Sequence, residues 1–140
     1  MFKPNVGQGY CYALIPNNCN WQAAKIMQCV FKSNQQLDGY VIVSSSDYKI
    51  LCDALSDIKN EFKQYHSQKV GGWKPQKGGK YWWVTTRYPT DIYSRGVGYK
   101  PVHSICGTGN PYSYNSFKTK QDADYMVNKI LSILKKHGLV

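Results

Sequence analysis

The sequence predicts a single α+β domain, in which a small mixed or antiparallel sheet packs with about three helices in the order β-α-β-α-β-β-(β)-α. Its 140 residues suffice for one hydrophobic core, and neither a repeat nor a linker divides residues 1–140. Short aromatic or β-branched runs alternate with segments of helical periodicity. With 42% hydrophobic residues the chain is not disordered, and no apolar run approaches the ~18 residues of a membrane span.

The first elements are predicted to be a strand, a helix and a second strand. Residues 9–15 are aromatic and apolar, and residues 16–18 carry turn-forming proline and asparagine, so a strand precedes a turn. Asn20 is a good N-cap residue, and the apolar residues that follow at helical spacing predict a largely buried helix over residues 21–32. The β-branched run at residues 40–43 is suited to a central strand.

The middle of the chain combines the clearest helix with a basic loop and further strands. Ser46 or Asp47 is expected to cap a helix whose apolar stripe runs from Tyr48 to Tyr65. Residues 71–79 hold four glycines and a proline, which predicts a flexible basic loop. Three strands are then predicted, at residues 81–88, 92–99 and 101–106. Side chains of the first strand alternate between two faces: one holds Trp82, Val84 and Thr86, and the other holds Tyr81, Trp83, Thr85 and Arg87.

The last element is predicted to be an amphipathic helix. Thr119 followed by Asp122 resembles a capping box, and apolar residues recur at helical spacing from Ala123 to Leu134. His137 and Gly138 supply the residue types that end a helix.

Five cysteines, at positions 11, 19, 29, 52 and 106, form no Cys-x-x-Cys pair. The start of the sequence lacks the apolar stretch of a secretory signal, so we expect free thiols in a reducing cytoplasm, with Cys29 and Cys52 on apolar helix faces. The cysteines and histidines are too dispersed for a zinc site, and the sequence predicts neither a metal nor another cofactor.

Charge is concentrated in one part of the chain. The net charge of the whole chain is +10, and residues 66–120 account for +8 of it because Asp91 is their single acidic residue. Half of the twenty aromatic residues lie in the same section. A concentrated positive potential with aromatic side chains is typical of a surface for nucleic acid or for an acidic protein. The residues predicted to form this surface are Lys69, Trp73, Lys74, Lys77, Lys80, Arg87, Tyr93, Arg95 and Lys100.

The composition of this section also bears on how it would bind. The whole chain holds two arginines, both in this section, against sixteen lysines, which disfavours bidentate reading of individual bases and favours contact independent of sequence. Trp73, in the glycine-rich loop, is the best candidate for an exposed aromatic anchor, with Tyr93 as a second, whereas Trp82 and Val84 are assigned to the core.

An enzymatic alternative remains open. His66 and His103 flank the basic section, and with Arg87 they supply the acid, base and cation of a metal-independent ribonuclease. Their spacing does not bring them together, so the sequence leans away from catalysis without excluding it.

Residues 115–123, with Phe117, Thr119, Asp122 and Ala123 as the recurring positions, follow a Tyr-Trp-Trp strand and run into the final helix. This ending resembles the Phe-x-Thr-x-x-acid-Ala pattern of many small proteins encoded by phages and mobile elements. The resemblance covers about 30 residues and implies a host-takeover or anti-defence role, such as that of CRISPR inhibitors and anti-restriction proteins. Many such inhibitors are acidic mimics of DNA, whereas this chain is basic.

Together these observations favour a non-enzymatic, cytoplasmic binding protein that contacts nucleic acid or a nucleoprotein and modulates a host defence system. Two alternatives remain: the small ribonuclease, and a binder of an acidic partner protein without nucleic acid. The oligomeric state is not predicted.

Overall fold

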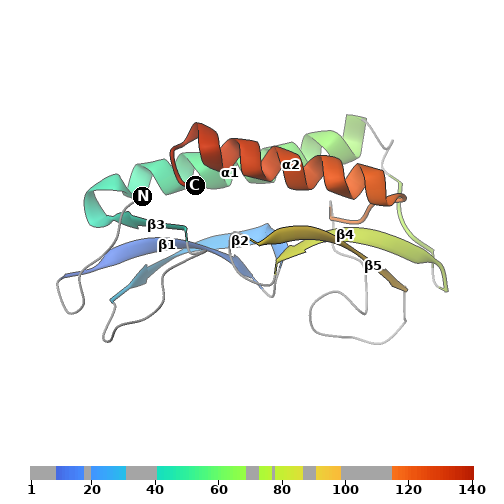
Figure 1. The fold of residues 1–140 in the computed structure, drawn as a ribbon, viewed down its shortest axis with the longest axis horizontal. Coiled ribbons are helices and arrows are strands. Elements are labelled where there is room, and N and C mark those ends of the chain that lie inside the picture. Colours follow the sequence, from blue (N-terminus) through green and yellow to red (C-terminus); the bar gives the residue numbers. More distant parts are fainter. Residues whose placement is uncertain are drawn as a thin grey trace.

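The computed structural model describes residues 9–17, 20–30, 41–68, 73–76, 78–86, 91–98 and 115–140. Within this part of the chain, an antiparallel sheet of five strands carries two α-helices on one face (Figure 1). In chain order the elements are β1 (Cys11–Asn17), β2 (Asn20–Cys29), β3 (Val41–Ser44), the 3-10 turn η1 (Ser45–Asp47), α1 (Tyr48–Gln68), β4 (Lys80–Thr86), β5 (Ile92–Gly98) and α2 (Lys120–Lys136).

The predicted α+β class is confirmed, but the predicted helix over residues 21–32 is wrong. Residues 20–29 form strand β2, so the described residues contain two α-helices where about three were expected. β2 pairs with β1 over residues 25–29, with Leu14 opposite Ile26 and Cys11 opposite Cys29, and again at Asn20 beyond an irregularity in the register. Good helix formers such as alanine and lysine occupy this segment, but pairing with β1 provides backbone hydrogen bonds and the main core buries Ala24, which together outweigh local preference.

The strands lie in the order β3-β1-β2-β4-β5. The run predicted as a central strand is therefore β3, at one end of this order and paired with β1. β4 and β5 form at the positions predicted for them, while the strand expected at residues 101–106 and the ends of the predicted strands at residues 87–88 and 99 lie outside the described residues.

The main core lies between the sheet and the two helices. α1 packs on β1, β2 and β3, and α2 packs on β4 and β5. Both helices lie on the same side of the sheet (Figure 1). Both helices bury apolar stripes that the sequence predicted, which for α2 comprise Ala123, Met126, Ile130 and Leu134. The side chains of this core that are fully buried and largest are Trp21, Phe62, Phe117, Leu14, Leu51 and Ile58.

A second, smaller apolar cluster lies on the other face of the sheet. Strand alternation turns Tyr12 and Leu14 toward the helices and Cys11 and Ala13 away from them, where they pack with Ile42. These three residues are at most 4% exposed. The sheet is therefore buried on both faces at β1.

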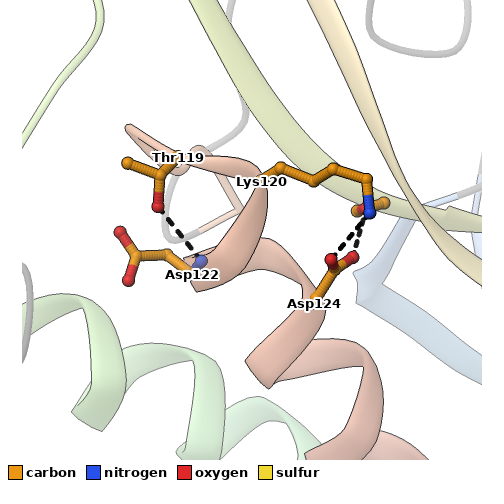
Figure 2. A network of polar contacts seen from close by, with 5 residues as sticks. Thr119, Lys120, Asp122 and Asp124 are labelled. Carbon is orange, nitrogen blue, oxygen red and sulfur yellow. Dashed lines mark hydrogen bonds and ion pairs between the residues drawn. The ribbon is translucent and has the colours of Figure 1, made fainter.

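α2 begins as the sequence predicts. The Thr119 hydroxyl accepts a hydrogen bond from the Asp122 backbone N–H at 3.2 Å, and Figure 2 shows this N-cap beside the Lys120–Asp124 ion pair. At the other end, Gly138 adopts a φ of 71°, the left-handed conformation that glycine accepts readily, and the helix stops.

Residues 115–117 join the two halves of the sheet. β2 and β4 pair directly at Asn20 and Thr85. Further along the same edge of β4, the backbone of Phe117 exchanges two hydrogen bonds, of 2.7 and 2.8 Å, with the backbone of Trp82. Asn115 continues this pairing with its side chain: its Oδ1 accepts from Val84 N at 2.9 Å and its Nδ2 donates to Val84 O at 3.0 Å. The side-chain amide thus takes the place of a strand residue.

Candidate nucleic-acid interface

Five residues of the predicted basic aromatic surface lie in the described part of the chain. Lys74, Lys80 and Arg95 are exposed, Tyr93 is 37% exposed, and Trp73 is half-buried rather than the freely exposed anchor that the sequence favoured. The other four predicted residues lie outside the described residues: Lys69, Lys77, Arg87 and Lys100.

Tyr93 and Arg95 project from the face of β5 that points away from the helices. Between them, Ser94 donates a hydrogen bond of 2.5 Å to Asp124 of α2, which places Ser94 on the helix side. Because side chains alternate along a strand, Tyr93 and Arg95 must point to the opposite face. They form a cation and aromatic pair on the outer surface of the ribbon made by β4 and β5.

The aromatic residues of β4 are distributed differently from the prediction. Tyr81 and Trp83, on the outer face with Arg95, are both 0% exposed, so they are not available to stack on a ligand. Trp82 packs against the main core as expected but remains partly exposed. The Trp82 ring lies directly over Gly96: a Cβ atom at position 96 would be only 3.2 Å from the ring. On the same ring, Lys120 Nζ lies 6.0 Å from the centroid. The predicted single surface is therefore divided between two faces of the ribbon.

The cations of this region differ in how far they are neutralised. Lys120 forms an ion pair of 2.7 Å with Asp124, and the pKa of that carboxyl is lowered by the hydrogen bond from Lys120 and next by the one from Ser94 (Figure 2). In contrast, Lys74, Lys80 and Arg95 make no ion pair with another described residue. Their positive potential is thus left to act on a ligand.

His66 does not occupy an accessible catalytic position. Its side chain is 5% exposed, and burial lowers the pKa of the imidazole, an effect that a hydrogen bond with the Ser116 backbone opposes and the nearby charge of Lys74 reinforces. His66 is therefore expected to be neutral at pH 7. Its suggested catalytic partners, His103 and Arg87, lie outside the described residues.

The neighbour of His66 ties the two helices together. The Tyr65 hydroxyl donates a hydrogen bond to Asp122 at 2.9 Å, while the Tyr65 ring stacks on Tyr125 at a centroid distance of 4.7 Å. Burial and the adjacent carboxylate raise the pKa of Tyr65 to about 12. Both features indicate that this polar cluster positions α2 on α1.

A groove that the sequence analysis missed lies between β2 and α1. It has a volume of about 410 Å³, and the residues lining it are Ala24, Lys25, Ile26, Tyr48, Cys52, Leu55, Ser56 and Lys59. Because the predicted helix at residues 21–32 placed these β2 side chains wrongly, the groove had no counterpart in the prediction. The sequence signal for an extended segment was the alternation of apolar Ala24 and Ile26 with charged Lys25.

Neither a metal centre nor a membrane-spanning helix is found in the part of the chain that the structure describes. No three histidine, cysteine or acidic side chains gather there as metal ligands would. The helices among the same residues are too short or too polar to cross a bilayer.

Comparison of the chain with family models, with curated proteins and with solved structures gives no match. The similarity of residues 115–123 to small phage proteins therefore stays a prediction. What the structure adds is that this segment bridges β2 and β4 and starts α2.

Proposed function

We propose that this protein is a non-enzymatic binding protein whose β4–β5 ribbon contacts nucleic acid or a nucleoprotein. The observation that carries the proposal is a group of three exposed cations, Lys74, Lys80 and Arg95, that make no ion pair with another described residue. The exposed Tyr93 shares the outer face of β5 with Arg95. Following the resemblance of its C-terminal segment, we further propose that it is a phage-encoded modulator of host defence machinery acting in the host cytoplasm.

The physical basis is counterion release supplemented by stacking. Each cation placed at a phosphate releases condensed ions, so binding weakens as salt rises. A tyrosine ring can stack on any base, which contributes roughly 1–3 kcal/mol per base without selecting sequence. The outer-face pair of Tyr93 and Arg95 combines both effects within two residues of one strand.

The test is a salt series with labelled RNA and DNA of mixed sequence. We expect affinity to fall steeply with salt, and the double variant Lys80→Gln/Arg95→Gln to bind roughly tenfold or more weakly, with a salt slope reduced by roughly 1.5. Fluorescence anisotropy from 50 to 300 mM salt measures both quantities.

The matched control for this test is Lys49→Gln/Lys135→Gln, which removes the same charge from exposed helix positions away from the ribbon. It should bind almost as well as the unaltered protein. An affinity that does not change with salt, or equal losses in both double variants, would contradict the proposed interface. Recovery of intact RNA after the incubation separates binding from the ribonuclease alternative.

Binding of an acidic partner protein is a second candidate function, which the groove between β2 and α1 favours. Ala24, Ile26 and Leu55 give the groove an apolar lining, while Lys25 and Lys59 provide positive charge at it. Because consecutive strand residues face opposite ways, a groove lined by residues 24–26 reaches the edge of β2. Among the described residues, that edge pairs with another strand at Asn20 alone. An extended peptide of alternating apolar and acidic residues would fit by strand addition.

For this candidate the probe is a synthetic peptide of alternating leucine and glutamate. Saturable binding is expected, together with slower alkylation of Cys52, which lines the groove. Lys25→Glu/Lys59→Glu should abolish both effects, whereas Lys49→Glu/Lys63→Glu, which reverses two exposed charges on α1 outside the groove lining, should retain them. If the peptide binds but the rate of Cys52 alkylation does not change, the peptide binds outside the groove. Peptide mapping by mass spectrometry reads Cys52 separately from the other cysteines.

A further inference from the structure

Strand β2 brings two cysteines that are distant in sequence into contact. Cys11 and Cys29 are direct cross-strand partners in β1 and β2, and their Sγ atoms are 3.3 Å apart. Opposed residues of antiparallel strands have Cα atoms about 4.5–5.5 Å apart, which lies within the range that a disulfide spans. A disulfide bond of about 2.05 Å therefore requires the sulfur atoms to approach by about 1.2 Å, without a change of strand register.

The two thiols differ in their access to solvent. Cys11 is 3% exposed and packs with Ala13 and Ile42 in the cluster on the sheet face away from the helices. Cys29 is half-buried, and the next residue, Val30, is 48% exposed. A small reagent in solution therefore reaches Cys29 first, and Cys11 lies directly behind it.

We propose that Cys11 and Cys29 form a reversible dithiol site that a low-molecular-weight disulfide, such as oxidised glutathione, converts into a cross-strand disulfide. The more accessible thiol of Cys29 acts as the attacking group and the buried thiol of Cys11 as the resolving group. Cys52, which lines the groove on the helix side of the sheet, takes no part.

The reaction proceeds by two exchanges. The Cys29 thiolate attacks one sulfur of the small disulfide, forms a mixed disulfide and expels the first small thiolate. Cys11 then loses its proton to that thiolate or to water, and its sulfur attacks Cys29 Sγ and expels the second thiolate. Two electrons pass from the protein to the reagent, which leaves as two reduced thiols.

The surroundings of Cys11 agree with a resolving role. Burial, followed by the hydrogen bond and charge of neighbouring Cys29, raises the pKa of Cys11 to about 12. As a thiol it reacts poorly with reagents in solution, since the thiolate is the nucleophile. Once Cys29 carries a mixed disulfide, an electrophilic sulfur lies beside Cys11 in place of a second thiol, and close contact compensates for the low thiolate fraction of Cys11.

Closing the bond would link β1 and β2 covalently at the end of the hairpin away from its turn. Cys11 and Cys29 are the last pair of the β1–β2 register, and Asn17 and Asn20 are the first pair beside the turn. The hairpin is the central link between β3 and β4 in the sheet, so the oxidised protein should resist unfolding more strongly.

The experiment equilibrates the unaltered full chain with oxidised glutathione, alkylates the remaining thiols and maps cysteine peptides by mass spectrometry. We expect a cross-link between the peptides of Cys11 and Cys29, reversed by dithiothreitol, and a melting temperature raised by roughly 5–10 °C. Since this arm uses the unaltered protein, it does not depend on how a variant folds.

Variants then assign the two roles. Cys11→Ser should stop at a stable glutathione adduct on Cys29, Cys29→Ser should leave Cys11 reduced, and Cys52→Ser should form the cross-link as the unaltered protein does. The inference is overturned if Cys11 and Cys29 both remain fully open to alkylation in oxidised glutathione after brief unfolding in denaturant. A cross-link that joins either of them to another cysteine overturns it as well.

Discussion

Replacing Asn115 by alanine is expected to lower the free energy of unfolding by about 3 kcal/mol, although the position lies in no helix or strand. The side chain is fully buried and bonds Val84 twice, and its Nδ2 also donates to Asn20 Oδ1 at 2.7 Å. Alanine leaves the Val84 N–H and C=O without this partner at the junction of β2 and β4. Urea unfolding followed by tryptophan fluorescence measures the loss.

Two further variants make the Asn115 prediction specific. Asn115→Asp preserves shape but sets carboxylate oxygens against Val84 O and Asn20 Oδ1, so at pH 7 it should cost at least as much as alanine. Burial would raise the pKa of the introduced carboxyl, so its penalty should shrink as pH falls and the protonated group donates again. Asn128→Ala, at an exposed position of α2, should change stability by less than about 0.5 kcal/mol. Equal effects at positions 115 and 128 would disprove the bridging role.

The second large effect is expected at Trp21, where replacement by alanine should cost about 3–5 kcal/mol. Trp21 is 0% exposed and is among the largest side chains of the main core. Its removal from β2 leaves a cavity beneath the helices that the surrounding strands cannot fully close. A domain with about 5–15 kcal/mol of total stability would then be close to unfolding at 37 °C.

Trp21→Phe separates packing from polarity at the same position. The indole Nε1 is buried and has no hydrogen-bond partner among the described residues, so phenylalanine removes an unsatisfied donor while filling most of the space. The loss should stay below about 1.5 kcal/mol. Gln28→Ala, exposed on the same strand, serves as the control. A loss from phenylalanine equal to that from alanine would contradict this prediction and indicate that the indole N–H makes a stabilising hydrogen bond.

The candidate interface was predictable in composition but not in geometry. The excess of charge in residues 66–120 follows from counting, and the exposure of Lys74, Lys80 and Arg95 agrees with it. A count of residue types does not show which aromatic side chains are exposed to solvent. Trp83 and Tyr81 have the same composition signal as Tyr93, yet they are buried because both faces of β4 are covered.

The misassigned segment at residues 20–29 shows where local reasoning fails. Its alanine, lysine, methionine and glutamine are neutral or favourable in helices, and Asn20 resembles an N-cap. In the structure the Asn20 side chain serves the junction with Asn115 instead. The error concealed both the groove beside α1 and the contact between Cys11 and Cys29, since each exists because this segment is extended.

The sequence by itself determined the α+β class, helices α1 and α2, strands β4 and β5 and the location of the charge, because periodicity, capping residues and composition are local properties. The tertiary structure alone decided that residues 20–29 pair with β1, that Asn115 bridges β2 and β4, and that Cys11 meets Cys29. These features join residues far apart in the chain. Their stability comes from burial and hydrogen bonds that exist after the segments meet, which local preference does not encode.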